Sequence, residues 1–179
     1  MKSCAQPTPE TLKPVIRSKR FPLEIMLIGV CWYLPIHAAC IQDMNDSFDF
    51  RVSTNKDVTA EEYAQLARSV GWGSEEDSKL FVASNAAYPL VVHARGASGL
   101  LIGYLSAFSD AAFSTMLGEL IVHNEFQGRG VGRAMLEVVE KQWPGVPIYI
   151  KAMGGAKHFF KACGYKVPRA EMTVLFKRP

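Results

Sequence analysis

Residues 118–143 read GELIVHNEFQGRGVGRAMLEVVEKQW, and this stretch decides the fold. It begins as a strand, because Leu120 and Val122 alternate with their neighbours in the period of two of pleated backbone. A turn follows in which glycine occupies positions 128, 130 and 132, so no β-carbon blocks a close approach there. Apolar residues then recur at helical spacing, at Val131, Ala134, Met135, Val138, Val139 and Trp143. The stretch predicts a strand, a glycine-rich turn and a helix that faces a core.

The glycine-rich turn is suited to hold a phosphate. A helix that opens directly from such a turn aims its unpaired backbone N–H groups and its positive dipole end at one point. Arg129 and Arg133 add positive charge at the same place. The spacing is neither the dinucleotide fingerprint G-x-G-x-x-G nor a P-loop, which ends in Gly-Lys-Ser/Thr. A tight strand-to-helix turn with solvated arginines is the alternative interpretation.

The run Gln127-Gly-Arg-Gly130-Val-Gly132 resembles the Gln/Arg-x-x-Gly-x-Gly/Ala signature of the GNAT superfamily of N-acetyltransferases. The resemblance covers roughly the last two thirds of the chain, from Gly71-Trp72 through Ile102–Tyr104 to HFFKACGY at 158–165 and EMTVLFK at 171–177. It implies an acyl-coenzyme A site, with the pyrophosphate on the loop amides and the pantetheine beside the preceding strand. The residues that it assigns to acetyl-CoA are Leu120, Ile121, Val122, Gln127, Gly128, Arg129, Gly130, Val131, Gly132, Arg133 and Phe160.

Length and composition agree with one enzyme domain. The chain has 179 residues, of which 49% are hydrophobic, enough for a single domain with a good core. Its formal charge of +3 comes without a basic stripe, so nucleic acid is not an expected partner. The cysteines at 4, 31, 40 and 163 lack metal-ligand spacing, so no metal is expected. Reduced thiols fit a cytoplasmic protein best.

Residues 1–47 are expected to be an extension, partly disordered or helical, before a catalytic domain at 48–179. Prolines at 7, 9 and 14 predict a disordered arm, and KRFPLEIMLIGVCWYLPIHAAC at 19–40 follows it. A membrane helix needs about 20 apolar residues, but the run Ile25–Ile36 is shorter and contains Pro35. A signal peptide has support in the basic lead, although the lead is long and His37 disrupts the cleavage box. No membrane partner is therefore expected.

A third interpretation of this extension is a resemblance. The segment RFPLEIMLIGVCWYL at 20–34 resembles the opening of bacterial insertion-sequence transposases, but without their catalytic carboxylates. It implies a fused fragment before a complete acetyltransferase domain. We expect this fragment to be dispensable for catalysis.

The remaining pattern predicts a mixed α/β domain. Strands are expected at 48–52, 90–94, 100–108, 115–123, 148–152 and 172–177. Helices are expected after Thr59, which forms a capping box with Glu62, after Ser74, with Leu80 and Phe81 on its inner side, from Val131 and around 156–163. The GNAT resemblance implies a mostly antiparallel twisted sheet of six to seven strands, with a splay between the fourth and fifth strands and about four flanking helices.

Acetyl transfer to an amine needs a neutral amine, a polarised thioester carbonyl and a proton for the departing thiolate. The resemblance implies that a backbone N–H at Leu120 or Ile121 polarises the carbonyl, a contribution of about 3 kcal/mol. Glu119 is the expected general base, directly or through a water, because partial desolvation raises the pKa of a carboxylate toward the working pH. A salt-bridged or solvated strand residue is the alternative. His93, His123 and His158 are expected to be structural.

The thiolate is where the sequence departs from the family. The usual Phe-Tyr-x-x-x-Gly-Phe reads Phe159-Phe160-Lys161-Ala162-Cys163-Gly164-Tyr165 here, so the tyrosine hydroxyl is missing at Phe160. Tyr165 occupies the place of an aromatic that normally packs. Water could serve instead, because a thiol of pKa about 8.5 leaves readily as thiolate. Slower turnover, not inactivity, is the expectation.

The acceptor is the least determined feature. Glu75, Glu76, Asp77 and Asp110 lie in segments that border the acceptor in relatives, where an acidic rim would attract an amine. They serve equally well as helix N-terminal and turn residues. A small-molecule amine and a protein lysine both stay open, and an exposed final strand could pair across a homodimer. Two functions follow: an N-acetyltransferase that acts by direct attack in a ternary complex, or a non-catalytic acyl-coenzyme A sensor.

Overall fold

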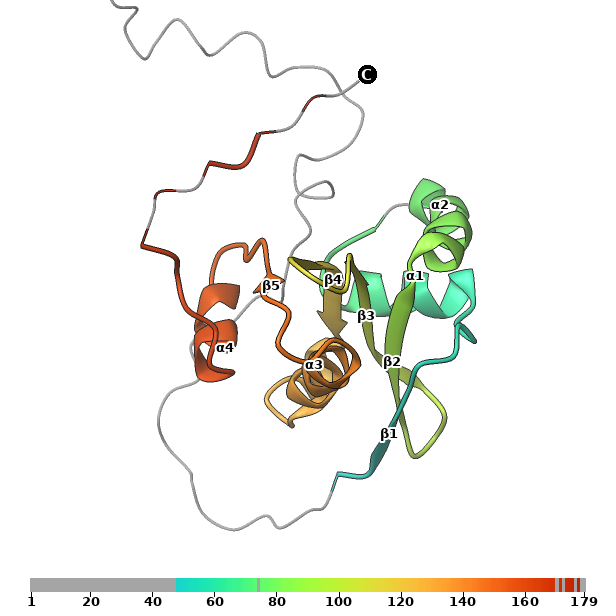
Figure 1. Ribbon diagram of the computed structural model, residues 1–179. Coiled ribbons are helices and arrows are strands. Elements are labelled where there is room, and N and C mark those ends of the chain that lie inside the picture. The colour runs from blue at the N-terminus through green and yellow to red at the C-terminus, as the bar shows by residue number, and fades with distance from the viewer. Residues whose placement is uncertain (1–47, 74, 170, 172, 176, 178–179) are drawn as a thin grey trace, which may run out of the picture.

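The computed structural model describes residues 48–73, 75–169, 171, 173–175 and 177. Five strands form one sheet in the order β1-β2-β3-β4-β5 (Figure 1). The strands are β1 (Phe50–Ser53), β2 (Leu90–Gly96), β3 (Leu101–Ser109), β4 (Thr115–Val122) and β5 (Ile148–Tyr149). The helices are α1 (Ala60–Ser69), α2 (Glu75–Ala87), α3 (Val131–Gln142) and α4 (Ala156–Ala162), with a 3₁₀ turn η2 (Asn124–Phe126). The predicted mixed α/β class with four helices is confirmed.

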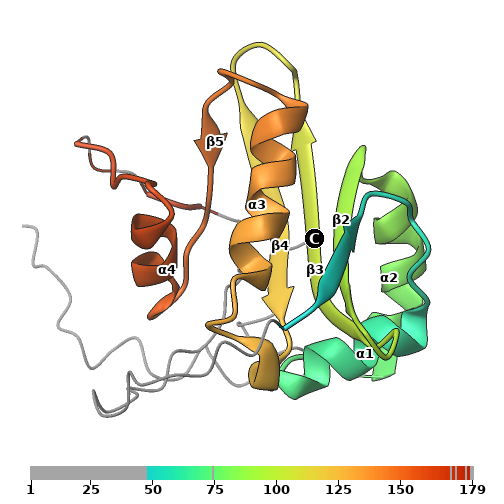
Figure 2. The same ribbon diagram turned by 90° about the horizontal axis from the view of Figure 1, so that it is seen from below.

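Helices cover both faces of the sheet. On one face, Leu66 of α1 and Phe81 of α2 pack against Val91 and Ile121 of the sheet. On the other face, the apolar stripe of α3 packs with Leu120 and with α4. Figure 2 shows α3 lying along β4, and Figure 1 shows α1 and α2 on the opposite side of the sheet from α3. Period-two alternation along the strands therefore separates two cores, one for each layer of helices.

The sheet is antiparallel from β1 to β4, and β5 joins it in parallel. The β4–β5 ladder contains only Thr115↔Ile148 and Met116↔Tyr149. Beyond these two pairs the strands diverge, as Figure 2 shows, and the C-terminal half of β4 runs without β5 beside it. The expected splay between the fourth and fifth strands lies here.

The strand count and three local predictions are wrong. The sheet of the described residues has five strands, not six to seven, and the strand expected at 148–152 ends at Tyr149. The described residues of 172–177 belong to no strand, and Leu175 is 86% exposed; Met172 and Phe176 lie outside the described residues. A strand needs a neighbouring ladder, and the short β5 offers almost none. In α2, Phe81 is buried but Leu80 is 63% exposed.

A β-bulge interrupts β4 at Gly118 and Glu119. Leu117 pairs with Ala107 and Leu120 pairs with Leu105, so Gly118 and Glu119 together oppose the single residue Ser106. The Ser106 hydroxyl accepts the backbone N–H of Glu119 at 3.1 Å and so replaces a ladder bond. A bulge of this kind redirects side chains relative to a regular strand.

The start of α1 is anchored to β2. Thr59 and Glu62 form the predicted capping box, which is confirmed. The guanidinium of Arg95 on β2 donates to Glu62 Oε2 at 3.0 Å and to the Asp57 carbonyl oxygen at 2.8 Å. The Arg95 hydrogen bond is the main reason that the pKa of Glu62 falls from 4.5 to about 2, against a burial effect of the opposite sign. The first turn of α1 is thereby fixed over the sheet.

Removal of the Arg95 guanidinium should lower stability in a pH-dependent way. A carboxylate with a depressed pKa stabilises the folded state above its unfolded value, here near 4.5, and this stabilisation is lost as pH falls toward 2. Arg95→Met should therefore unfold at lower urea concentration than the wild type near neutral pH, and the difference should shrink below about pH 4. Arg51→Met, which removes an exposed arginine from β1, is the control. A difference that stays constant down to about pH 2.5 would exclude Glu62 as the partner.

Gly118 should not tolerate a side chain. A β-carbon there would lie 2.4 Å from Ser106 Oγ and 2.5 Å from Tyr88 Oη, so the bulge would have to move. Gly118→Ala should cost about 1–3 kcal/mol of unfolding free energy, as overpacking does, measured by urea denaturation. In the control Gly96→Ala, the nearest heavy atom is Ile102 Cγ2 at 3.8 Å, and we expect almost no loss. Equal effects at the two positions would contradict the bulge geometry.

Candidate functional site

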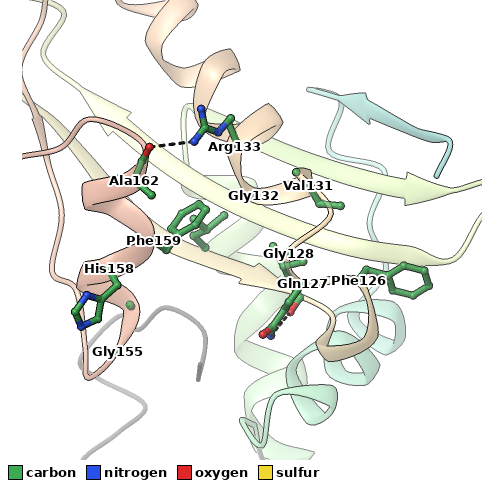
Figure 3. A pocket seen from close by; sticks show the side chains of 14 residues that line it. Phe126, Gln127, Gly128, Val131, Gly132, Arg133, Gly155, His158, Phe159 and Ala162 are labelled. Atoms are coloured by element: carbon green, nitrogen blue, oxygen red, sulfur yellow. Dashed lines mark hydrogen bonds between the residues drawn. The ribbon is translucent and has the colours of Figure 1, made fainter. Parts of the chain in front are cut away.

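A cavity of about 700 Å³ lies beside the C-terminal half of β4, where β5 no longer pairs with that strand. Figure 3 shows its walls, which come from the end of β4, the glycine loop, the first turn of α3 and one side of α4. The lining residues are mostly apolar or glycine: Leu120, Val122, Phe126, Gln127, Gly128, Gly130, Val131, Gly132, Arg133, Gly155, Ala156, His158, Phe159 and Ala162. The structure thus gathers most of the predicted cofactor residues around one cavity.

The glycine loop has the backbone that the sequence requires. Gly128 and Gly130 adopt φ of +76° and +86°, in the left-handed region that disfavours a β-carbon. Gly130 is the N-cap of α3 and makes no side-chain cap hydrogen bond. The first N–H groups of a helix have no partner within the helix. In α3 these include the N–H groups of Val131 and Gly132, two residues that line the cavity. This arrangement suits an anion such as a phosphate.

Gly132 has a second role, in packing. A β-carbon on it would lie 3.0 Å from Cζ of Phe159, a ring that lines the cavity from α4. The absence of a side chain therefore lets α4 approach the start of α3. Larger residues at 132 would push the Phe159 ring into the cavity.

The two arginines of the loop behave differently. Arg133 lines the cavity and donates to the Ala162 carbonyl oxygen at 3.0 Å, which ties α3 to the last turn of α4 (Figure 3). Arg129 is absent from the lining; its guanidinium lies 5.2 Å from the Phe48 ring centroid and 5.6 Å from that of Phe126. Cation–π attraction to these two stacked rings accounts for its position. The sequence predicts both arginines at the phosphate site, but only Arg133 lines the cavity.

Gln127 and His123 hold the loop in place. The Gln127 side-chain amide donates to the Val122 carbonyl oxygen at 3.1 Å, so the loop is fastened to the end of β4. His123 is the N-cap of η2, and its ring nitrogen accepts the Glu125 N–H at 3.4 Å. His123 is thus hydrogen-bonded, as expected.

Adjacent residues of β4 serve opposite faces of the sheet. Leu120 and Val122 line the cavity, whereas Ile121 is buried among the residues of α1 and α2. Ile121 was assigned to the cofactor and does not reach the cavity. Glu119 also faces the α1 side, because its carboxylate accepts the Tyr63 hydroxyl of α1 at 2.8 Å.

Strand geometry also chooses between the two expected carbonyl donors. The His123 N–H bonds to the Ile102 carbonyl oxygen of β3 at 2.9 Å. Because N–H directions alternate along an antiparallel ladder, the N–H of Ile121 also faces β3, whereas that of Leu120 faces the opening beside β4. Leu120 is therefore the better placed of the two.

Glu119 lies among aromatic side chains. Tyr63 stacks on Phe81 with ring centroids 4.1 Å apart and meets the edge of Tyr104 at 5.3 Å. Burial raises the pKa of Tyr88 and of Tyr104, and the negative charge of Glu119 raises both further. The phenols of Tyr88 and Tyr104 are therefore neutral near pH 7.

The two phenylalanines of α4, Phe159 and Phe160, are placed differently from the expectation, in which Phe160 contacts the cofactor. Phe160, assigned to the cofactor, is only 3% exposed and packs in the core, whereas Phe159 lines the cavity. Tyr165 donates its hydroxyl to Glu140 of α3 at 3.1 Å, so it is held on the α3 side and packs, as the family pattern implies. His158 lines the cavity and is exposed. No sequence signal distinguishes the two rings, because Phe159 and Phe160 lie at i+3 and i+4 from Ala156, both on its helix face.

Other expected residues are structural. His93 is buried with its ring nitrogen 2.5 Å from Asn55 Oδ1, and burial lowers its pKa. The Asp110 carboxylate accepts three backbone N–H groups of the β3–β4 turn, which lower its pKa to about 2. Asp110 is thus engaged as a turn residue. The side chains of Glu75, Glu76 and Asp77 lie outside the described residues.

Neither a metal-binding cluster nor a helix able to cross a membrane occurs among the described residues. Within the described ranges, no three His, Cys, Asp or Glu side chains come together as a metal site would require. Among the helices of the same part of the chain, none has the length and hydropathy needed to cross a membrane.

Comparison with known proteins gives relatives that match part of the chain. An uncharacterised N-acetyltransferase, ycf52, of Pyropia yezoensis is 28% identical over 96 residues, which cover 52% of this chain and 55% of that protein. The ycf52 protein of Porphyra purpurea matches with the same identity and coverage. The chain thus spans about half the length of these curated relatives.

Solved structures show the fold. A GNAT-family acetyltransferase from Streptococcus pneumoniae superposes with a TM-score of 0.60 at 15% identity, over 73% of this chain and 100% of that one. A GNAT-family N-acetyltransferase from Escherichia coli in complex with CoA gives a TM-score of 0.51 at 15% identity, over 70% and 73% of the two chains. The family model of the acetyltransferase (GNAT) domain matches residues 76–167, just over half of the chain. With the glycine loop and the splayed sheet in place, this match shows that the protein belongs to the GNAT acetyltransferase family.

Proposed function

We propose that the protein transfers the acetyl group of acetyl-CoA to a primary amine by direct attack in a ternary complex, with Glu119 as general base. One observation carries this proposal: neighbouring residues of β4 face opposite sides of the sheet. Leu120 lines the cavity that ends at the glycine loop, and Glu119 lies on the opposite side, beside Tyr63. A donor and an acceptor bound on these two sides would meet at the same point of one strand.

The cavity fits the acyl donor. Amides at the start of α3 and the left-handed glycines suit a diphosphate, and the apolar side chains of Leu120, Val122 and Phe159 suit a pantetheine arm. The CoA complex of the Escherichia coli structure, which shares the fold, supports this choice of ligand. Bound acetyl-CoA would supply the thioester whose acyl carbon the amine attacks.

The residues of this chain then have separate tasks. Glu119 takes the proton that the amine loses and passes it to solvent. The Leu120 N–H stabilises negative charge on the acyl oxygen while the carbon–sulfur bond breaks. Because Phe160 has no hydroxyl and that of Tyr165 is bound to Glu140, water is the proton source for the thiolate.

A non-catalytic acyl-CoA sensor is the second candidate, and the missing hydroxyl at Phe160 favours it. Release of free CoA separates the two functions. The measurement uses acetyl-CoA with a panel of small diamines, polyamines, aminoglycosides and a lysine peptide. Amine-dependent thiol release identifies an enzyme and its acceptor class, whereas CoA binding without release with any amine identifies a sensor.

Glu119→Gln should reduce turnover strongly and leave the binding of CoA intact. The amide cannot accept the proton from the amine, so kcat should fall by about 10²- to 10⁴-fold, the usual contribution of a general base. The affinity for CoA, measured by calorimetry, should stay within about twofold because Glu119 lies across the strand from the cavity. A variant with wild-type kcat would remove Glu119 from the mechanism.

Gly130→Ala should weaken CoA binding, and Gly145→Ala should not. Both glycines have left-handed φ, +86° and +80°, with no atom near the position of a new β-carbon, so both variants should lose about 1–2 kcal/mol of stability. Of the two glycines, Gly130 lines the cavity and Gly145 does not. A shift of the backbone N–H groups next to Gly130 should raise the Kd for CoA by roughly tenfold or more. Calorimetric titrations of the two variants, after melting curves confirm equal folding, make the comparison. Equal Kd values would show that the loop does not hold the ligand.

A further inference from the structure

We propose that Tyr63 is a positioning residue that orients the Glu119 carboxylate toward the acceptor; this inference rests on the role of Glu119 proposed above. The Tyr63 hydroxyl donates to Glu119 Oε2 at 2.8 Å, across 56 positions of sequence. It is a contact between α1 and the bulge of β4. A side chain held in this way presents its carboxylate in one orientation.

The tyrosine ring is itself firmly held. It stacks on Phe81 of α2, with centroids 4.1 Å apart and planes inclined by 15°. Tyr104 of β3 meets it edge-on at 5.3 Å and 77°. Both geometries are favoured for aromatic pairs. The phenol thus has little freedom to leave the carboxylate.

The helix that carries Tyr63 is fixed one residue earlier. Glu62 closes the capping box with Thr59 and bonds to Arg95 of β2. This anchor sets the position and the rotation of the first turn of α1. Tyr63 follows directly, so its direction toward β4 is set by bonds that do not involve Glu119.

Glu119 is fixed on its backbone side as well. Its N–H donates to Ser106 Oγ at 3.1 Å within the bulge. The backbone and the carboxylate are therefore held by different elements, β3 and α1. This two-sided attachment is what a positioned general base requires.

The hydrogen bond also has an electrostatic consequence. A hydroxyl that donates to a carboxylate stabilises its charged form and lowers its pKa, whereas burial raises it. In the described part of the chain, the titratable groups that face Glu119 are the phenols of Tyr63 from α1, Tyr88 beyond α2 and Tyr104 from β3. The Tyr63 phenol donates to the carboxylate. Its loss should raise the pKa of Glu119.

Tyr63→Phe tests the proposal because it keeps the ring and removes the hydroxyl. The acid limb of kcat/KM should move to higher pH by about one unit. The rate should fall mainly at acid pH and recover at alkaline pH, and the Kd for CoA should not change. A purely structural role would lower the rate equally at all pH values. That result would overturn the proposal.

Tyr104→Phe is the matched control. It removes a phenol hydroxyl from the same cluster, but that hydroxyl donates to Asn85 at 3.2 Å. Its acid limb should coincide with that of the wild type. The same shift in both variants would show a general effect of the cluster and would contradict a specific role of Tyr63.

A carbon-13 NMR titration of the Glu119 carboxyl, assigned with Glu119→Gln, keeps this test independent of catalysis. Tyr63→Phe should raise the titration midpoint by about one unit, and Tyr104→Phe should leave it unchanged. If no amine is acetylated but this shift appears, the proposed function fails while the Tyr63 contact stands. If the Glu119 titration midpoint is unchanged in Tyr63→Phe, the inference is wrong even if the enzyme is active.

Discussion

The short parallel ladder between β4 and β5 is the constraint on which the rest of the site depends. It holds the strands together at Met116 and Tyr149 and then ends, so the C-terminal half of β4 has an open side. The cavity occupies that opening, and α4, which follows β5, becomes its far wall. A longer ladder would fill this space with backbone hydrogen bonds. The hydrogen bond of Arg133 to Ala162 closes the arrangement by tying α3 to α4.

The bulge at Gly118 and Glu119 gives one strand two functions. It shifts the register once, so that Leu117 and Leu120, three positions apart, both face the α3 side. Glu119 faces the other side and meets Tyr63. The cost is a backbone N–H removed from the regular ladder, and Ser106 satisfies it. A glycine is needed next to Glu119 because the Tyr88 hydroxyl occupies the place of a β-carbon. Local backbone irregularity and proposed catalysis are therefore coupled in this chain.

Most predictions that rest on closely spaced residues are confirmed, whereas the strand count and the C-terminal strand, which depend on contacts between distant segments, are wrong. The stripe from Val131, the glycine turn and the capping box at Thr59 depend on residues within one or two turns, and all three are confirmed. The strand expected at 172–177 failed because an apolar pattern does not reveal whether a partner ladder exists. The rings of Phe159 and Phe160 differ by one helical position, and only packing on Gly132 decides which reaches the cavity. The Arg129 guanidinium lies against the Phe48 ring and not at the cavity, and the Tyr63 hydroxyl bonds to Glu119. Local residue spacing encodes neither contact.

The central claim is that amides at the start of α3 and along β4 hold an acyl-CoA next to Glu119. A titration of nitrogen-15-labelled protein with CoA, followed by amide NMR shifts, tests it most directly. We predict that the largest shifts fall at Gly128, Gly130, Val131, Gly132 and Leu120, with small shifts at the remote Gly99 turn. Shifts confined to residues outside the cavity, or no shifts at millimolar CoA, would contradict the account.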